Sequence, residues 1–201
     1  MRPMNLSTSS TTSRRSCESP VDAGHPADCL RERDAAQRLA RRLVGSTIPA
    51  LLLVGTRGED VALDRLASRS LVLYLYPGAG SSPDGGDDSL LTDATQHRAF
   101  RERLSELANR RFVVLGLSSE TPETQLVSAV AQRLSHVLLS DPRLLLADAM
   151  GLPTVTVTGA RIYRRLTIVV HRGQIGHVFF PVANVQRSAD QVLTWAKVNG
   201  L

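Results

Sequence analysis

Two almost continuous apolar runs constrain the fold of this chain more than any other sequence feature. The runs are Leu71–Tyr76 and Phe112–Leu117. Between them, residues 90–109 have helical spacing, with Phe100 and Leu107 on one face. Continuous apolar runs are typical of strands that are buried on both faces of a sheet. Two such strands joined through a helix form a right-handed βαβ unit, so the sequence predicts an α/β fold.

The C-terminal part of the chain predicts antiparallel strands and a last helix. The runs Arg165–Val170 and Ile175–Phe180 flank a glycine-containing turn, which is typical of a hairpin. Ser188 is the expected cap of a final helix, in which Trp195 is expected to be a core residue. Together with the βαβ unit, these elements predict a thioredoxin-like fold with a central mixed sheet flanked by helices.

The chain divides into a short polar tail and one domain. Residues 1–27 are polar and poor in acids and show no apolar periodicity, which predicts a disordered N-terminal tail. Helical spacing begins at Asp28, the expected N-cap, and ends at Gly45. With 201 residues in all, residues 28–201 are expected to form a single domain.

Several functional classes are excluded by what the sequence lacks. No apolar run approaches the ~20 residues of a membrane span, and no apolar segment of a secretion signal follows Arg14 and Arg15, so a cytoplasmic protein is expected. The net charge is +5, but acids alternate with the arginines, which is typical of solvated helices rather than a nucleic-acid surface. Neither C-x-x-C nor zinc-type spacing occurs, so no metal and no cofactor is expected.

Four strings, in order along the chain, resemble one known family. They are Leu71–Pro77, Val113–Ser119, Leu138–Pro142 and Arg164–Val170. They resemble the strands and turns around the active site of the peroxiredoxins, specifically the alkyl hydroperoxide reductase and thiol-specific antioxidant group. The resemblance covers about residues 45–198. It implies a thioredoxin-like fold, a homodimer and thiol-dependent reduction of hydroperoxides.

The peroxiredoxin motif lacks its cysteine in this sequence. In that family, a Pro-x-x-x-Thr/Ser-x-x-Cys loop supplies the thiolate that attacks the peroxide. Counting forward from Pro77 places Ser81 at the hydroxyl position and Asp84 at the cysteine position. Counting back from the helix that contains Phe100 places Asp93 there instead. We prefer Asp93, because a loop tolerates insertions, whereas a one-residue slip turns a helix face by about 100°.

The resemblance also assigns an arginine to the site. Arg165 stands where the family's arginine faces the thiolate, and we expect it either to pair with Asp93 or Asp84 or to form a remnant anion site. The two thiols of the chain are Cys17, in the tail, and Cys29, in the first turn of a predicted helix. A redox or disulfide role is one alternative for each cysteine, and no role is the other.

Three functions from different classes remain open. The first is a peroxiredoxin-family oxidoreductase. The second is a pseudoenzyme that uses the scaffold to bind a partner, a hydroperoxide or a small anion. The third is a changed enzyme in which Asp93 or Asp84 acts as a general acid or base. Because a carboxylate is a poor nucleophile towards peroxide oxygen, we expect the peroxidase activity to be lost. Two further residues are expected to be structural: Tyr76 in the core and His97 on the surface.

Overall fold

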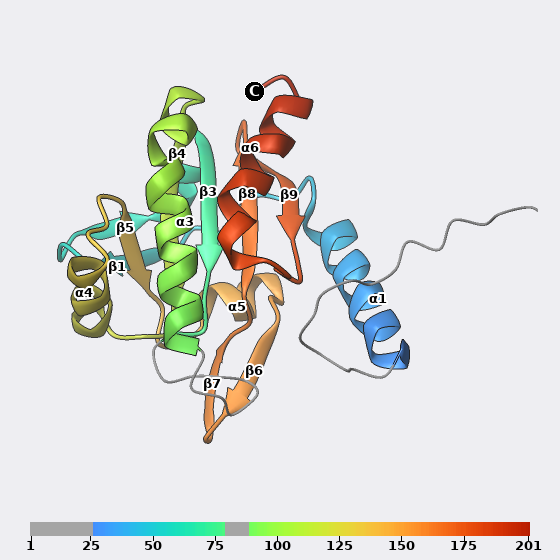
Figure 1. Cartoon of the computed structure of the whole chain (residues 1–201), viewed down its shortest axis with the longest axis horizontal. Helices are drawn as coiled ribbons and strands as arrows, with labels where there is room; N and C mark the ends of the chain where they lie inside the picture. The colour runs from blue at the N-terminus through green and yellow to red at the C-terminus, as the bar shows by residue number, and fades with distance from the viewer. Residues whose placement is uncertain (1–25, 79–88) are drawn as a thin grey trace, which may run out of the picture.

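The computed structural model describes residues 26–78 and 89–201. Within these residues, seven strands form one mixed sheet in the order β2-β1-β5-β4-β3-β8-β9, and β6 and β7 form a separate pair (Figure 1). The strands are β1 (Leu52–Gly55), β2 (Asp60–Ala62), β3 (Ser70–Leu75), β4 (Phe112–Ser118), β5 (Val137–Ser140), β6 (Thr154–Val157), β7 (Ala160–Tyr163), β8 (Leu166–His171) and β9 (Gln174–Phe179). The helices are α1 (Pro26–Leu43), α2 (Leu63–Ala67), α3 (Ser89–Asn109), α4 (Pro122–Ala131), α5 (Leu145–Met150), the short 3-10 helix η1 (Val185–Arg187) and α6 (Ser188–Val198).

The predicted βαβ unit is confirmed at the centre of this sheet. β3 and β4 run parallel, in register from Ser70 opposite Phe112 to Leu75 opposite Leu117, and α3 connects them. The predicted hairpin of β8 and β9 is also present, and it extends the sheet by antiparallel pairing of β8 with β3. The result is a mixed sheet flanked by helices, which is the α/β architecture that the sequence predicts.

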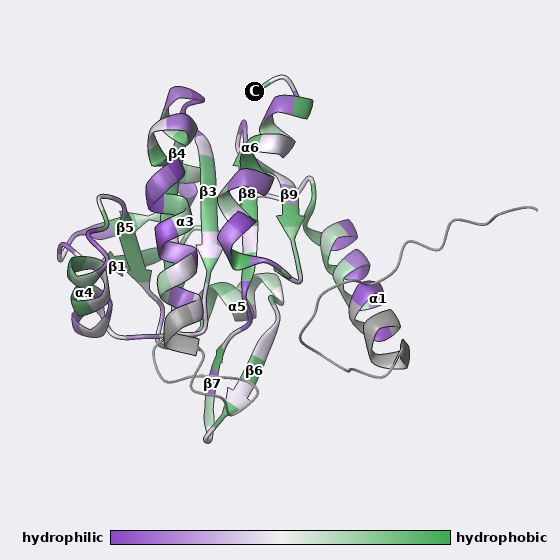
Figure 2. Cartoon of the chain, viewed as in Figure 1, coloured by the Kyte–Doolittle hydropathy of each residue, from purple (hydrophilic) through white to green (hydrophobic). Residues whose placement is uncertain are grey.

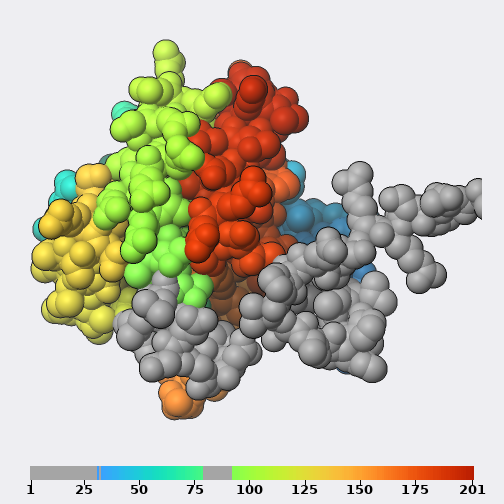
Figure 3. Space-filling view, viewed as in Figure 1, coloured from blue at the N-terminus to red at the C-terminus, as the bar shows by residue number. Residues whose placement is uncertain are grey.

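Alternating side chains of β3 supply two cores, one on each face of the sheet. Leu71, Leu73 and Leu75 pack with residues of α1, α2 and α5 on one face. Val72 and Tyr74 pack with residues of α3 and α6 on the other. Figure 2 shows hydrophobic colouring along the strands and hydrophilic colouring on much of α3. Figure 3 shows α3 and α6 packed side by side over their face of the sheet. This two-sided burial explains why the central strands are apolar without alternation.

Some element boundaries differ from the sequence-based predictions. α1 begins at Pro26, so Asp28 lies inside the helix rather than capping it, while residues 1–25 of the predicted tail lie outside the described residues. Ser188 is the first residue of α6 and not its cap, because Asn184 already caps the preceding turn by accepting a hydrogen bond from the Arg187 N–H. β2 and β7 were not predicted, because each is short and has no continuous apolar run.

No helix in the described part of the chain is both long and apolar enough to cross a membrane. Within residues 26–78 and 89–201, no three His, Cys, Asp or Glu side chains are grouped so that they could hold a metal ion.

Gly116 of β4 gives a direct test of the packing around Tyr74. A Cβ at this position would lie 2.7 Å from Cζ of Tyr74 and 2.5 Å from Cδ2 of Leu138. Because both neighbours are fully buried, Gly116→Ala is expected to lower the free energy of unfolding by about 1–3 kcal/mol, measured by chemical denaturation. Gly55→Ala is the matched control, since the three atoms nearest its Cβ would belong to the carboxylate group of Glu59, the far end of a flexible side chain. Equal losses in the two variants would contradict the prediction.

Candidate functional site

Antiparallel pairing of β3 and β8 brings the candidate site residues together. Leu75 at the end of β3 lies opposite Leu166 at the start of β8. Gly78, just after β3, and Arg165, just before β8, are therefore at the same end of the sheet. α3 begins at this end and contributes Asp93 from its second turn. Residues far apart in sequence meet here because two strand ends and one helix start coincide.

Asp93 and Arg165 form a buried ion pair. Nη2 of Arg165 donates to Oδ1 of Asp93 at 2.6 Å, and the two side chains are 13% and 7% exposed, respectively. The other carboxylate oxygen, Oδ2, accepts a hydrogen bond from the Gly78 N–H at 3.1 Å. Nη1 of Arg165 donates to Oε1 of Gln96, one turn further along α3. Of the two predicted pairings of Arg165, with Asp93 or with Asp84, the structure therefore contains the one with Asp93.

The other predicted site residues have different outcomes. Ser81, Asp84 and Cys17 lie outside the described residues. Cys29 lies in the first turn of α1, as the sequence predicts, and its redox role stays a prediction. The catalytic roles suggested for Asp93, Arg165 and Ser81 likewise stay predictions.

Burial and hydrogen bonding act on Asp93 in opposite directions. Burial raises the pKa of Asp93, whereas the Arg165 guanidinium and the Gly78 N–H lower it, and burial is the larger effect. Two buried polar atoms lie in the same region. Nε2 of Gln96 and Oγ1 of Thr167 have no hydrogen-bond partner in the part of the chain that the structure describes. The site therefore holds a carboxylate, a guanidinium and further polar atoms that are largely buried.

A second buried polar group, which sequence reasoning missed, lies beside the site on the α3 face. The Tyr74 hydroxyl is hydrogen-bonded to Nδ1 of His97 at 2.9 Å and to Nε2 of His136 at 2.8 Å. The Tyr74 ring stacks on Phe100, with ring centroids 4.4 Å apart. A tyrosine hydroxyl has one proton to donate, so one of the two histidines donates to it. Burial lowers the pKa of His97 to about 3 and that of His136 to about 4. Both rings are therefore neutral at pH 7.

The expected surface position of His97 was wrong, because its side chain is only 2% exposed. His97 follows Asp93 by four residues and precedes Phe100 by three. Positions with this spacing share one helix face, so all three side chains point towards the sheet. The spacing could have identified His97 as a buried residue from the sequence. Tyr76 is buried, as the sequence predicts, and its ring lies edge-on to His97 with centroids 4.6 Å apart.

Comparison with known proteins identifies relatives of this chain. The family model described as Redoxin matches residues 43–193. Peroxiredoxin bcp1 of Schizosaccharomyces pombe is 31% identical over 109 residues, which cover 54% of this chain and 51% of that protein. The bcp protein of Haemophilus influenzae is 30% identical over 110 residues, covering 54% of this chain and 64% of its own length. The chain therefore spans less than two thirds of these curated relatives.

Solved structures share the fold. Peroxidoxin BcpB of Mycobacterium tuberculosis has a TM-score of 0.66 at 23% identity, covering 78% of this chain and 97% of the other. PrxQ of Xylella fastidiosa has a TM-score of 0.67 at 20% identity, covering 79% of this chain and 97% of that structure. The thioredoxin-like fold is thereby confirmed.

Proposed function

Because the chain belongs to the Redoxin family and is peroxiredoxin-like, we propose that it uses this scaffold for binding and has lost thiol-dependent peroxide reduction. The single observation that supports the proposal is the buried ion pair of Asp93 and Arg165. In the register that we prefer, Asp93 occupies the position of the family's peroxide-attacking cysteine. The arginine that would face a thiolate there is hydrogen-bonded to a carboxylate instead.

The chemistry of the two groups explains why this exchange would end thiol catalysis. A thiolate is the nucleophile in cysteine chemistry, and a nearby cation promotes it by lowering the thiol pKa. A carboxylate carries the same charge but is a poor nucleophile towards peroxide oxygen. The two cysteines of the chain are at positions 17 and 29, so no thiol exists between residues 30 and 201. The Asp93 carboxylate therefore reproduces the charge of a thiolate without its reactivity.

A peroxide-consumption assay tests the proposal. The full chain, with excess dithiol and hydrogen peroxide, is expected to consume peroxide no faster than the dithiol alone. The variant Cys17→Ser/Cys29→Ser is the matched control and is expected to behave identically. Turnover that disappears in this variant would overturn the proposal, because a cysteine from the N-terminal part would then carry the reaction. Turnover that persists in it would overturn the proposal through chemistry that needs no thiol.

The scaffold is further proposed to form a homodimer in the cytoplasm and to accept a hydroperoxide or a small anion. These proposals rest on the resemblance to peroxiredoxins. Acid–base chemistry at Asp93 stays a prediction beside them.

A further inference from the structure

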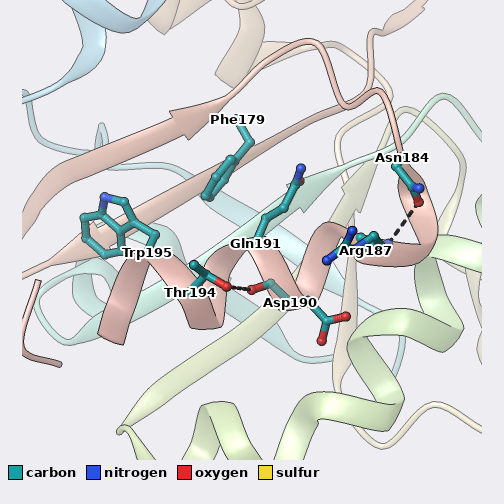
Figure 4. Close-up of a pocket in the computed structure, with 7 residues that line it drawn as sticks. All are labelled: Phe179, Asn184, Arg187, Asp190, Gln191, Thr194 and Trp195. Carbon is teal, nitrogen blue, oxygen red and sulfur yellow. Dashed lines mark hydrogen bonds between the residues drawn. The ribbon is translucent and has the colours of Figure 1, made fainter. Parts of the chain in front are cut away.

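A cavity of about 530 Å³ lies between β9 and α6, with none of the Asp93–Arg165 site residues in its lining. Figure 4 shows the side chains around it. Its lining includes Phe179 from β9, Asn184 from the following turn, Arg187 from η1, and Asp190, Gln191 and Trp195 from α6. A volume of roughly 300–1,000 Å³ is typical of sites that bind small molecules. The cavity is thus large enough for a compact organic ligand.

One wall of the cavity is aromatic and held in place. Phe179 and Trp195 are both half-buried, so each keeps part of its ring accessible. The His177 ring packs against both, with its centroid 4.4 Å from that of Phe179 and 5.9 Å from that of Trp195. The Trp195 ring also lies against Gly176, where an added Cβ would be 2.9 Å from Cη2. The accessible ring surface is therefore pre-organised for a flat apolar group. Trp195 was expected in the core; it packs against the core on the α3 and α6 face, and its side chain is only partly buried.

The charge available to a ligand in this cavity is positive. Asp190 is engaged by Arg103, whose Nε donates to Oδ1 at 2.8 Å, and Figure 4 shows the carboxylate pointing away from Phe179. No ion pair joins the Arg187 side chain to another residue within 26–78 and 89–201. Burial lowers the pKa of His177, which favours the neutral form of this ring. Of the two charged residues in the lining, Asp190 is therefore ion-paired with Arg103, whereas Arg187 has no ion pair among the described residues.

Asn184 and Gln191 line the cavity together with Arg187 and contribute their carboxamide groups (Figure 4). Oδ1 of Asn184 accepts a hydrogen bond from the Arg187 backbone N–H at 3.2 Å, which leaves its amide N–H groups for other partners. A guanidinium with amide donors nearby suits a carboxylate, because charge-assisted hydrogen bonds are stronger than hydrogen bonds between neutral groups. Aromatic surface at one end of the cavity and these donors at the other favour a ligand that has a flat ring and a carboxylate.

We infer that the cavity between β9 and α6 binds a small aromatic carboxylate, with its ring against Trp195 and Phe179 and its carboxylate on Arg187. The inference goes beyond the proposed function and rests on this cavity alone. Peroxide turnover by the protein would overturn the proposed loss of catalysis and would not affect binding at this cavity.

Trp195 is the one tryptophan of the chain, so its indole N–H gives a single signal in ¹H–¹⁵N spectra. Titration of the full-length protein with benzoate is expected to shift this signal saturably, with a Kd of about 1 mM for so small a ligand. Benzyl alcohol lacks the charge and cyclohexanecarboxylate lacks the aromatic ring. Each is expected to bind about fivefold more weakly than benzoate or worse.

Two arginine variants locate the binding. Arg187→Gln is expected to weaken benzoate binding about fivefold or more, because it removes the charged donor and keeps the backbone N–H that Asn184 caps. Arg69→Gln changes an exposed arginine outside the lining and is expected to bind as the natural chain does. Three results would overturn the inference: no saturable shift up to about 20 mM benzoate, equal binding by Arg187→Gln, or equal binding of benzyl alcohol or cyclohexanecarboxylate.

Discussion

Replacing Arg165 with methionine is expected to lower the free energy of unfolding by about 3–5 kcal/mol at pH 7. The substitution leaves the carboxylate of Asp93, 7% exposed, without its cation. Gly78 still donates one hydrogen bond to Asp93, which is too little to replace the lost charge. Chemical denaturation at pH 7 measures the loss. The difference in unfolding free energy between the variant and the natural chain should become smaller as the pH is lowered, because protonation of Asp93 removes the unpaired charge.

An exposed ion pair in the same protein provides the matched control. Nη1 of Arg161 lies 2.7 Å from Oδ1 of Asp148, but these side chains are 46% and 59% exposed. Arg161→Met is therefore expected to cost less than about 1 kcal/mol. The double variant Arg165→Met/Asp93→Leu should lie closer to the natural chain than Arg165→Met alone, because apolar residues tolerate burial. If Arg165→Met lowers the free energy of unfolding no more than Arg161→Met does, burial does not determine how much the Asp93–Arg165 pair contributes to stability.

Acidification from about pH 6.5 to about pH 4 is expected to lower stability by several kcal/mol through His97 and His136. Their pKa values fall from 6.5 to about 3 and about 4 on folding. The unfolded chain therefore binds more protons than the folded chain in this range, and each histidine contributes a loss of up to about 1.4 kcal/mol per pH unit. Well above the unfolded pKa of 6.5, both states hold neutral rings, and this contribution is fully present.

Comparison with the variant His97→Asn/His136→Asn isolates this effect. Asp93 acts in the opposite sense at low pH, because its raised pKa lets the folded chain hold a proton that the unfolded chain has lost. The natural chain includes all of these contributions, whereas the double variant loses those of His97 and His136 and keeps those of Asp93 and of His177, whose pKa burial also lowers. Denaturation curves measured across the range should therefore show a smaller acid-induced loss for the variant. Parallel losses in the two proteins would show that the histidine pair does not control the pH dependence.

The candidate site was only partly predictable from the sequence. Asp93 and Arg165 were named from the helix register and from the string that includes Arg165, and the structure pairs them. Gln96 and Gly78, which bond to the same ion pair, were not named. His97 was placed on the wrong side of α3. His136 lies 62 residues from Tyr74, and no local pattern links the two.

The sequence alone determined the central sheet, because a strand buried on both faces needs a continuous apolar run, and β3 and β4 have one. The resemblance to peroxiredoxins also predicts, in either register, an aspartate at the position of the family's cysteine, and this stays a prediction. Only the tertiary structure decided that Asp93 pairs with Arg165, 72 residues away. That contact depends on the register of β3 against β8, which long-range hydrogen bonding sets. The cavity beside Trp195 likewise arises only when α6 packs along β9, because its walls come from separate elements.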